Sequence, residues 1–211
     1  LNNGMAGATF DFGTFLTTNG YDLRFTDSTG LTNLNYEIES WSIGSSAYVW
    51  VQVPRFNSNC YIWAKWGAVL QTNQPAYTTN GATWDSSFKG VWHFPIGASL
   101  TARDSTSNRN NGTVVSATAN AGVIGGGMNA AAGQYIDLLN KNNSLNVSAS
   151  NWTMQAWAKP SASIYWVNLV NADNYGIEGA GNSRWGLLQA NTIVACAESG
   201  PSGSFQHVMA T

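Results

Sequence analysis

The chain has 211 residues and a mass of 22.6 kDa, enough for one large domain or two small ones with a hydrophobic core. Only 9% of its residues are charged and the net charge is −2, so its nine Lys and Arg residues cannot supply the basic stripe that nucleic acid requires. No segment approaches the roughly 18 uninterrupted apolar residues of a membrane-spanning helix. The composition therefore excludes nucleic-acid binding and direct membrane insertion.

Neutral polar residues take the place of charged ones. The chain contains 24 Asn, 21 Ser and 18 Thr, while aromatic residues make up 12% and include ten Trp. Because 44% of the residues are hydrophobic, an intrinsically disordered chain is also excluded. We expect a folded protein whose surface is solvated by amides and hydroxyls and which has more aromatic side chains than its core needs.

Alternation of apolar and polar residues predicts β-strands in the first part of the chain. Residues 36–43, 47–53 and 60–66 follow this pattern, and the Gly-Ser-Ser link at 44–46 predicts a hairpin between the first two. In the second run, Tyr48, Trp50 and Gln52 share one face of the predicted strand. The polar stretch 71–80, which shows no periodicity, is interpreted as a boundary region.

A second series of short strands follows this stretch. The predicted strands lie at residues 91–94, 112–116, 134–138, 152–158, 165–170, 184–188, 192–197 and 205–209. Glycine clusters at 125–127 and 179–181 separate some of these runs as turns, and no amphipathic helix is evident. The pattern predicts an all-β fold of sandwich or jelly-roll type, with a leading β-sandwich at residues 1–88 and a second domain at 89–211.

Four segments of the second domain carry a family resemblance. They are DSTSNRNNGT at 104–113, GQYID at 133–137, WTMQAWAKP at 152–160 and FQHVMAT at 205–211. In this order they resemble laminin-G-like, concanavalin A-like jelly-roll domains of bacterial surface proteins. The resemblance implies a jelly roll located outside the cell or on its surface. Further strands normally follow the last segment in that family, so the jelly roll is expected to be incomplete, with its remaining strands in a longer protein or in a partner chain.

The first part of the chain carries a second resemblance. Segments 20–27, 36–41 and 49–54 are similar to an uncharacterised bacterial β-domain that often precedes such a jelly roll, with VWHF at 91–94 at the junction. Together, the two resemblances cover nearly the whole chain. Because the fold hosts lectins, carbohydrate-binding modules and glucanases, the resemblance alone leaves the function open.

A pair of carboxylates is the strongest catalytic candidate. Glu37 and Glu39 lie two residues apart on one predicted strand and point to the same face, as the acids of retaining glucanases with this fold do. The third downstream acid of those enzymes is missing here. The favoured interpretation is an edge pair that faces solvent or forms a salt bridge with Arg24 or Arg55.

Other catalytic residue types are scarce. His93 and His207 lie within apolar strand runs, where a hydrogen-bonded structural imidazole is the favoured role. Cys60 and Cys196 lie in similar runs, typical of small buried hydrophobes, and a disulfide between them stays open. The chain contains no metal-binding cluster of Cys and His residues.

Sugar binding is the chemistry that the composition favours. Aromatic rings stack on the apolar faces of sugars, and amide side chains bind hydroxyls, so such a site needs no metal or cofactor. Although each aromatic residue taken alone favours the core, we expect two or three of the ten Trp to be exposed. The candidate sugar-binding residues are Trp41, Tyr48, Trp50, Gln52, Trp63, Trp66, Trp84, Trp166 and Trp185.

Calcium is a secondary possibility. Asp104, Asn108 and Asn110 form an oxygen-rich loop that suits a hard cation, and related jelly rolls often bind Ca²⁺ near their rims. One carboxylate among amides makes a weak site, so a turn held by Asx hydrogen bonds is preferred.

Three functions follow from these observations. The first is a non-catalytic extracellular or cell-surface module that binds polysaccharide or glycoconjugate. The second is a structural subunit of an adhesin, fibre or surface layer that contacts further copies of itself or neighbouring domains. The third is a glycoside hydrolase that uses Glu37 or Glu39. The absence of a convincing catalytic constellation in the sequence favours the first.

Overall fold

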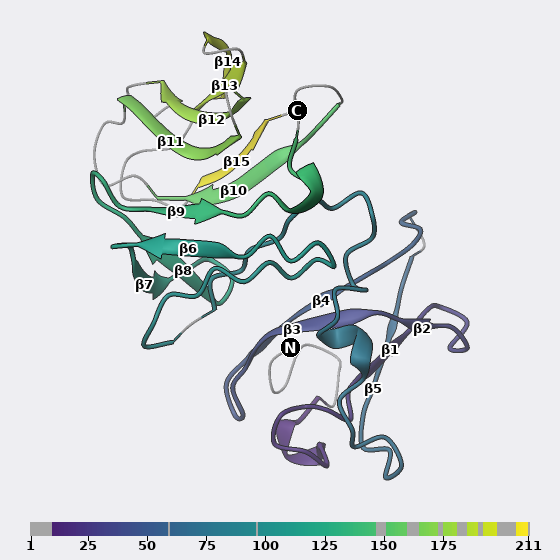
Figure 1. The fold of residues 1–211 in the computed structure, drawn as a ribbon. Coiled ribbons are helices and arrows are strands. Elements are labelled where there is room, and N and C mark those ends of the chain that lie inside the picture. Colours follow the sequence, from purple (N-terminus) through teal and green to yellow (C-terminus); the bar gives the residue numbers. More distant parts are fainter. Residues whose placement is uncertain are drawn as a thin grey trace. The chain divides into compact units, whose positions relative to one another are not determined.

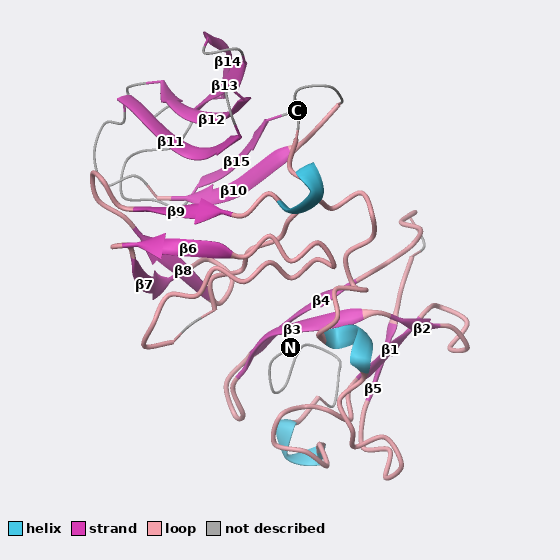
Figure 2. Cartoon of the chain, in the orientation of Figure 1, coloured by secondary structure: helices cyan, strands magenta, loops and turns pink. Residues whose placement is uncertain are grey.

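The computed structural model is all-β, with short 3₁₀ helices and antiparallel strand pairs (Figures 1 and 2). It describes the backbone of residues 10–58, 60–95, 97–146, 151–159, 165–172, 175–180, 185–189, 192–197 and 206–210. Beyond residue 160, side chains are described only at 169–171 and 207–209. The chain divides into two compact units, Leu1–Lys141 and Asn142–Thr211. The predicted all-β class is confirmed.

The first unit begins with a three-stranded sheet and a hairpin. Its first elements are η1 (Phe12–Thr14), β1 (Arg24–Thr26), β2 (Asn33–Leu34), β3 (Tyr36–Trp41), β4 (Ala47–Val51), β5 (Trp63–Lys65) and η2 (Ala76–Thr78). Strand β1 lies between β2 and β5, and β3 pairs with β4. All these pairings are antiparallel, and the hairpin forms where the Gly-Ser-Ser link predicted it.

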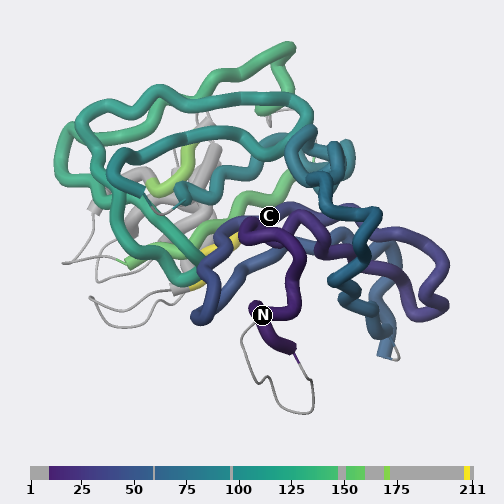
Figure 3. Tube along the Cα trace, turned by 90° about the horizontal axis from the view of Figure 1, so that it is seen from below, coloured from purple at the N-terminus to yellow at the C-terminus, as the bar shows by residue number. Residues whose placement is uncertain are grey.

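Alternate residues of these strands build the core. Leu23, Phe25, Leu34 and Tyr36 are buried together, and they pack against inward-facing residues of β4. A second cluster joins Phe10 and Phe12 to Ala47 and to the rings of Phe15, Trp41 and Trp66. Figure 3 shows the start of the described chain lying beside the β3–β4 hairpin.

A β-bulge interrupts β3. The register with β4 shifts between Ile38 and Ser40, which makes Glu39 the extra residue. Trp41 therefore returns to the inner face, opposite Ala47, while Glu37 and Glu39 stay on the outer face. One inserted residue thus places an aromatic side chain in the core and two carboxylates outside it.

The rest of the first unit consists of two strand pairs. These are β6 (Gly112–Val115) with β9 (Tyr135–Leu138), and β7 (Thr118–Ala121) with β8 (Gly126–Asn129). The expected strand at 91–94 is wrong, because only Trp92 forms an isolated bridge, with Asp104, and Phe94 has a left-handed backbone with φ 51°. The turn expected at 125–127 lies earlier, because Gly122 donates to the Gly125 carbonyl at 3.1 Å and β8 begins at Gly126.

The second unit contains the remaining strands, with η3 (Lys141–Asn143) at the boundary between the units. β10 (Met154–Ala158) pairs with β15 (Gln206–Ala210). A four-stranded sheet follows the order β11 (Tyr165–Ala172), β12 (Tyr175–Ala180), β13 (Trp185–Gln189) and β14 (Thr192–Ala197). The domain boundary expected at 88/89 lies inside the first unit and stays a prediction, as does the incomplete jelly roll.

Candidate functional site

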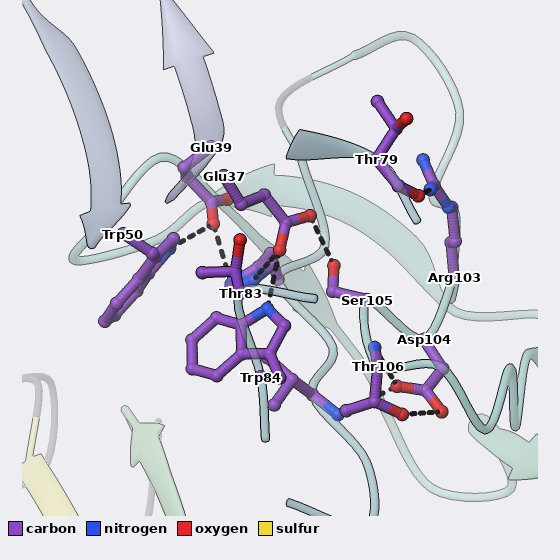
Figure 4. A network of polar contacts seen from close by, with 12 residues as sticks. Glu37, Glu39, Trp50, Thr79, Thr83, Trp84, Arg103, Asp104, Ser105 and Thr106 are labelled. Carbon is purple, nitrogen blue, oxygen red and sulfur yellow. Dashed lines mark hydrogen bonds and ion pairs between the residues drawn. The ribbon is translucent and has the colours of Figure 1, made fainter. Parts of the chain in front are cut away.

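Two glutamates and a histidine meet on the outer face of β3. His93 lies with Nδ1 2.7 Å from Glu39 Oε2 and with Nε2 3.7 Å from Glu37 Oε2. Indole nitrogens donate to the same carboxylates: Trp50 to Glu39 at 2.9 Å, and Trp84 to Glu37 at 2.6 Å (Figure 4). We call these five residues the histidine cluster.

The histidine cluster is largely closed to solvent. The exposed side-chain fractions are 12% for His93, 15% for Glu37 and 1% for Glu39. The Trp50 ring stacks on the imidazole at 5.3 Å between centroids, and the Trp84 ring tilts against it at 5.6 Å. An imidazolium in this position is paired with two carboxylates and lies over aromatic faces, which attract cations.

Two further residues hold the carboxylates in place. Ser105 donates its hydroxyl to Glu37 Oε1 at 2.6 Å. Gly125 lies so close to Glu39 that a Cβ atom at this position would be 3.1 Å from Glu39 Oε1. Glu39 Oε1 and His93 Nε2 are buried with no hydrogen-bond partner among the described residues. The cluster and its supports therefore come from β3, β4 and four later positions of the first unit.

The pKa values follow from this environment. Burial lowers the pKa of His93, but the two carboxylates, Glu37 nearby and Glu39 in contact with Nδ1, outweigh it and raise that pKa to about 9. Burial raises the pKa of Glu37, yet the nearby His93 imidazole and the hydrogen bonds from Ser105 and Trp84 outweigh it, so the net pKa is below its ordinary value. At neutral pH, a cationic imidazole thus faces anionic Glu37.

This arrangement corrects the favoured interpretation of the two glutamates. They do share one face, as expected, but they neither face solvent nor pair with Arg24 or Arg55. Arg24 instead donates to the main-chain oxygens of Tyr21 and Leu23. His93 has the hydrogen-bonded role expected of it, but its partners were not foreseen, because it lies in a loop and not in the strand predicted at 91–94.

Glu37 lacks the property that the general acid of a glycosidase needs. A general acid needs a carboxyl group whose pKa is raised, so that it is protonated at neutral pH. The pKa of Glu37 is shifted in the opposite direction, and His93 lies in contact with both carboxylates. The groups neutralise one another, which suits a structural junction better than proton transfer.

The predicted aromatic candidates separate into three sets. Trp41 and Trp66 pack against Phe15 in the core. Trp50 and Trp84 belong to the histidine cluster. Trp166 and Trp185 lie on β11 and β13, but their side chains fall outside the described residues.

The outer face of β4 carries the other two candidates of its strand. Tyr48 is exposed, and Gln52 accepts a hydrogen bond from the Asn35 amide at 3.1 Å. The expected sharing of one face by Tyr48, Trp50 and Gln52 is consistent with the register, because Val49 and Val51 pack into the core. Trp41 does not join this face, because the bulge turns it inward.

Trp63 on β5 is the one predicted tryptophan that the described structure leaves half exposed, at 50%. Its indole nitrogen donates to the Ser28 carbonyl at 3.2 Å, and the Tyr61 ring meets it edge-on with centroids 5.7 Å apart. Tyr61 is 56% exposed and was not among the candidates, although its spacing of two from Trp63 indicated the same face. We call this pair the Tyr61–Trp63 platform.

Other exposed aromatic rings were missed or misjudged. Phe56 and Tyr135 were not candidates and are exposed. Trp157, for which the core was favoured, is 48% exposed and contacts the ring of His207 at 5.0 Å. Alternation places such residues on one face of a strand but does not indicate whether another segment covers that face.

The oxygen-rich loop is a hydrogen-bonded turn. Asp104 is fully buried, and its carboxylate accepts from the backbone nitrogens of Val91, Thr106 and Asn110 and from the Thr106 hydroxyl, at 2.8–3.0 Å. The amides of Asn108 and Asn110 donate to the Lys89 carbonyl. A cation at Asp104 would have to displace these donors, so the contacts favour the turn over a calcium site.

The described part of the chain gives little support for a metal site or for a disulfide. There, no group of three or more His, Cys, Asp and Glu side chains is arranged to hold a metal ion. The thiol of Cys60 is free and donates to the Arg55 carbonyl at 3.4 Å. The side chain of Cys196 falls outside the described residues.

Comparison with known proteins adds one family match. A family model described as a domain of unknown function, DUF2341, matches residues 19–88. The matched segment contains Glu37, Glu39 and Trp63, and it ends before His93. No curated protein and no solved structure matches the chain. Within the ranges that the structure describes, no helix has the length and apolar character needed to cross a membrane.

Proposed function

We propose that this chain is a non-catalytic extracellular or cell-surface module that binds polysaccharide through the Tyr61–Trp63 platform. The observation that carries the proposal is the half-exposed ring of Trp63, held in place by its bond to Ser28 and by the edge of Tyr61. A ring fixed in this way loses little conformational entropy when a sugar stacks on it. Aromatic faces of this kind suit the apolar face of a pyranose.

Polar groups beside the platform can bind sugar hydroxyls. Lys65 is exposed on β5 with the same alternation as Trp63, and its ammonium group donates to the Gly30 carbonyl at 2.9 Å. Both side chains thus reach the loop between β1 and β2, where Thr29 donates to Asp27 at 2.6 Å. Such hydroxyl, carboxylate and ammonium groups are the usual partners of sugar hydroxyls.

The histidine cluster supports the non-catalytic part of the proposal. Its carboxylates are hydrogen-bonded and paired with His93, and Glu39 is almost inaccessible to a substrate. The residues that the glycosidase hypothesis requires are therefore occupied in holding the first unit together.

Affinity electrophoresis in gels containing neutral polysaccharides, together with a glycan array, tests the proposal. We expect at least one polysaccharide to retard the protein, and Trp63→Ala to weaken that binding by about tenfold or more, if stacking on a sugar contributes as much as the roughly 1–3 kcal/mol that aromatic side chains contribute on nucleobases. Tyr135→Ala, which removes an exposed ring outside the platform, is the matched control and should bind like the wild type. Equal loss in both variants, or no binding to any polysaccharide, would overturn the proposal.

A specific observation also favours the structural alternative. Four side chains outside the platform are strongly exposed and apolar: Leu31 at 88%, Phe56 at 90%, Val69 at 79% and Leu70 at 98%. Exposed apolar groups suit contacts with further copies or with neighbouring domains of a surface protein. Light scattering after size-exclusion chromatography tests this, and a strictly monomeric protein at high concentration would count against it.

A further inference from the structure

Two arginines meet at one backbone carbonyl. Arg103 donates to the Thr79 oxygen at 2.9 Å, and Arg109 donates to the same oxygen at 2.6 Å (Figure 4, for Arg103). Arg109 also donates to the main-chain oxygen of Asp104 at 3.1 Å. Two positive charges are thus brought together by a shared neutral acceptor.

No carboxylate balances this pair within the part of the chain that the structure describes. The ion pairs found there, at a limit of 4.0 Å, join His93 to Glu37 and Glu39, and none includes an arginine. Asp104 lies next to Arg103 in the chain, but its carboxylate is buried and turned to backbone donors. The pair therefore carries two charges without an anionic partner.

The backbone holds Arg109 in an unusual position. Its φ is 55°, in the left-handed region that few residues other than glycine and asparagine adopt. Its neighbours fix it there, because the amides of Asn108 and Asn110 both donate to the Lys89 carbonyl. The Arg109 guanidinium is thus held toward Arg103 before any ligand arrives.

We infer that Arg103 and Arg109 form a binding site for an oxyanion, namely a carboxylate or sulfate group of an acidic polysaccharide. Guanidinium groups bind such oxyanions in a planar, bidentate fashion, and each has five N–H donors, most of which remain available here. One isolated pair of arginines in a chain of net charge −2 does not suit a polyphosphate such as nucleic acid. The inference that the oxyanion belongs to a polysaccharide rests on the proposed function and specifies its ligand as an acidic polymer.

Matched polymers that differ only in charge test the inference. We expect polygalacturonate to bind at least about tenfold more tightly than its methyl-esterified form, and dextran sulfate more tightly than dextran, with both differences decreasing as NaCl is raised. In the double variant Arg103→Gln/Arg109→Gln, these differences should disappear. Gln removes the charge and retains an N–H donor. If the double variant does not fold, the single variant Arg103→Gln, which changes one exposed side chain, replaces it in the comparison.

Three controls separate the possible outcomes. Arg55→Gln removes one exposed positive charge elsewhere and should keep the preference for the acidic polymers. Arg103→Lys/Arg109→Lys keeps the charge but loses the planar donors, so the preference should fall. Trp63→Ala should weaken acidic and neutral forms equally. Equal binding of acidic and neutral forms by the wild type, or a preference kept in the Gln variants, would overturn the inference.

A second measurement separates failure of this inference from failure of the proposed function. If no polysaccharide binds, the arginine Nε–H signals are followed by NMR during titration with galacturonate and with sodium sulfate. This titration shows whether the oxyanion site exists without a polysaccharide. Saturable shifts of Arg103 and Arg109 that disappear in the Gln variants support the oxyanion site without the polysaccharide. An absence of such shifts overturns the site itself.

Discussion

Two pairs of aromatic rings in the first unit, each with one tryptophan on the outer side of a strand, lie in different surroundings. Trp50 is on the outer face of β4, and Trp84, from a later loop, lies beside it, with both indoles bonded to carboxylates around His93. Tyr61 and Trp63 are on the outer side of the β5 segment, and the Trp63 indole is bonded to a backbone carbonyl. The first pair packs against the ring of His93, and about half of each side chain of the second pair is exposed to solvent.

The comparison shows that position on a strand does not decide the role of an aromatic residue. Trp50 and Trp63 both alternate with inward-facing residues of their strands, so both were candidates for sugar stacking. The difference is the presence of buried charge: Glu37 and Glu39 require partners, and the later segments supply them. The three predictions that follow test this difference, beginning with the largest effect.

Removing the most buried carboxylate should have the largest effect. Glu39→Ala leaves the Nδ1 group of His93 and the indole of Trp50 without an acceptor in a closed environment. We expect the free energy of unfolding to fall by about 3–5 kcal/mol, measured by urea denaturation. Glu39→Gln keeps an acceptor and should lose less. A loss below about 1 kcal/mol in the alanine variant would show that the cluster is not a structural junction.

The stability of the protein should also depend on pH through His93. Because the folded pKa is about 9 and the ordinary value is 6.5, its contribution is complete below pH 6.5 and is lost as pH rises through about 9. The loss amounts to about 3 kcal/mol at most. The pKa of Glu37 is lowered in the folded protein. The contribution of Glu37 to stability is therefore complete above the ordinary pKa of 4.5 and is lost as the pH falls below that value.

Unfolding by urea at a series of pH values measures this dependence. The His93→Gln variant should show a flatter profile between pH 6.5 and 9 than the wild type, whose stability decreases over that range. Identical profiles in the two proteins would contradict the coupling between His93 and the two carboxylates.

The open platform should contribute least to stability. Trp63→Ala removes a ring that is half exposed and one hydrogen bond, so we expect a loss of about 1 kcal/mol. The same measurement on Trp50→Ala should give about 3 kcal/mol or more, as for other covered aromatic residues. Similar losses in the two variants would remove the distinction between the covered and the open pair.

The alternation of apolar and polar residues was sufficient to predict the strands that have a clear apolar face. The hairpin of β3 and β4, the position of β5 and the shared face of Glu37 and Glu39 all follow from a period of two. The preference for a turn around Asp104 also agrees with the structure, because Asx hydrogen bonds depend on neighbouring residues.

Contacts between distant segments could not be predicted in the same way. His93 and Ser105 reach β3 from loops more than 50 residues further along the chain, where no local pattern signals their partners. The bulge at Glu39 shifts the alternation by one residue, so Trp41 points to the core although a strict period of two would place it on the face of Glu37 and Glu39. The two arginines at Thr79 were missed because each is an isolated charge in the sequence.

The position of His93 has a practical consequence for dividing the protein. The family match ends at residue 88, but the carboxylate of Glu39 is buried by partners that come later, up to Gly125. A recombinant fragment that stops at the end of the match would retain Glu37 and Glu39 and lose their cation. The segment that sequence similarity delimits is therefore shorter than the cooperative folding unit, and fragments for expression should extend past residue 125.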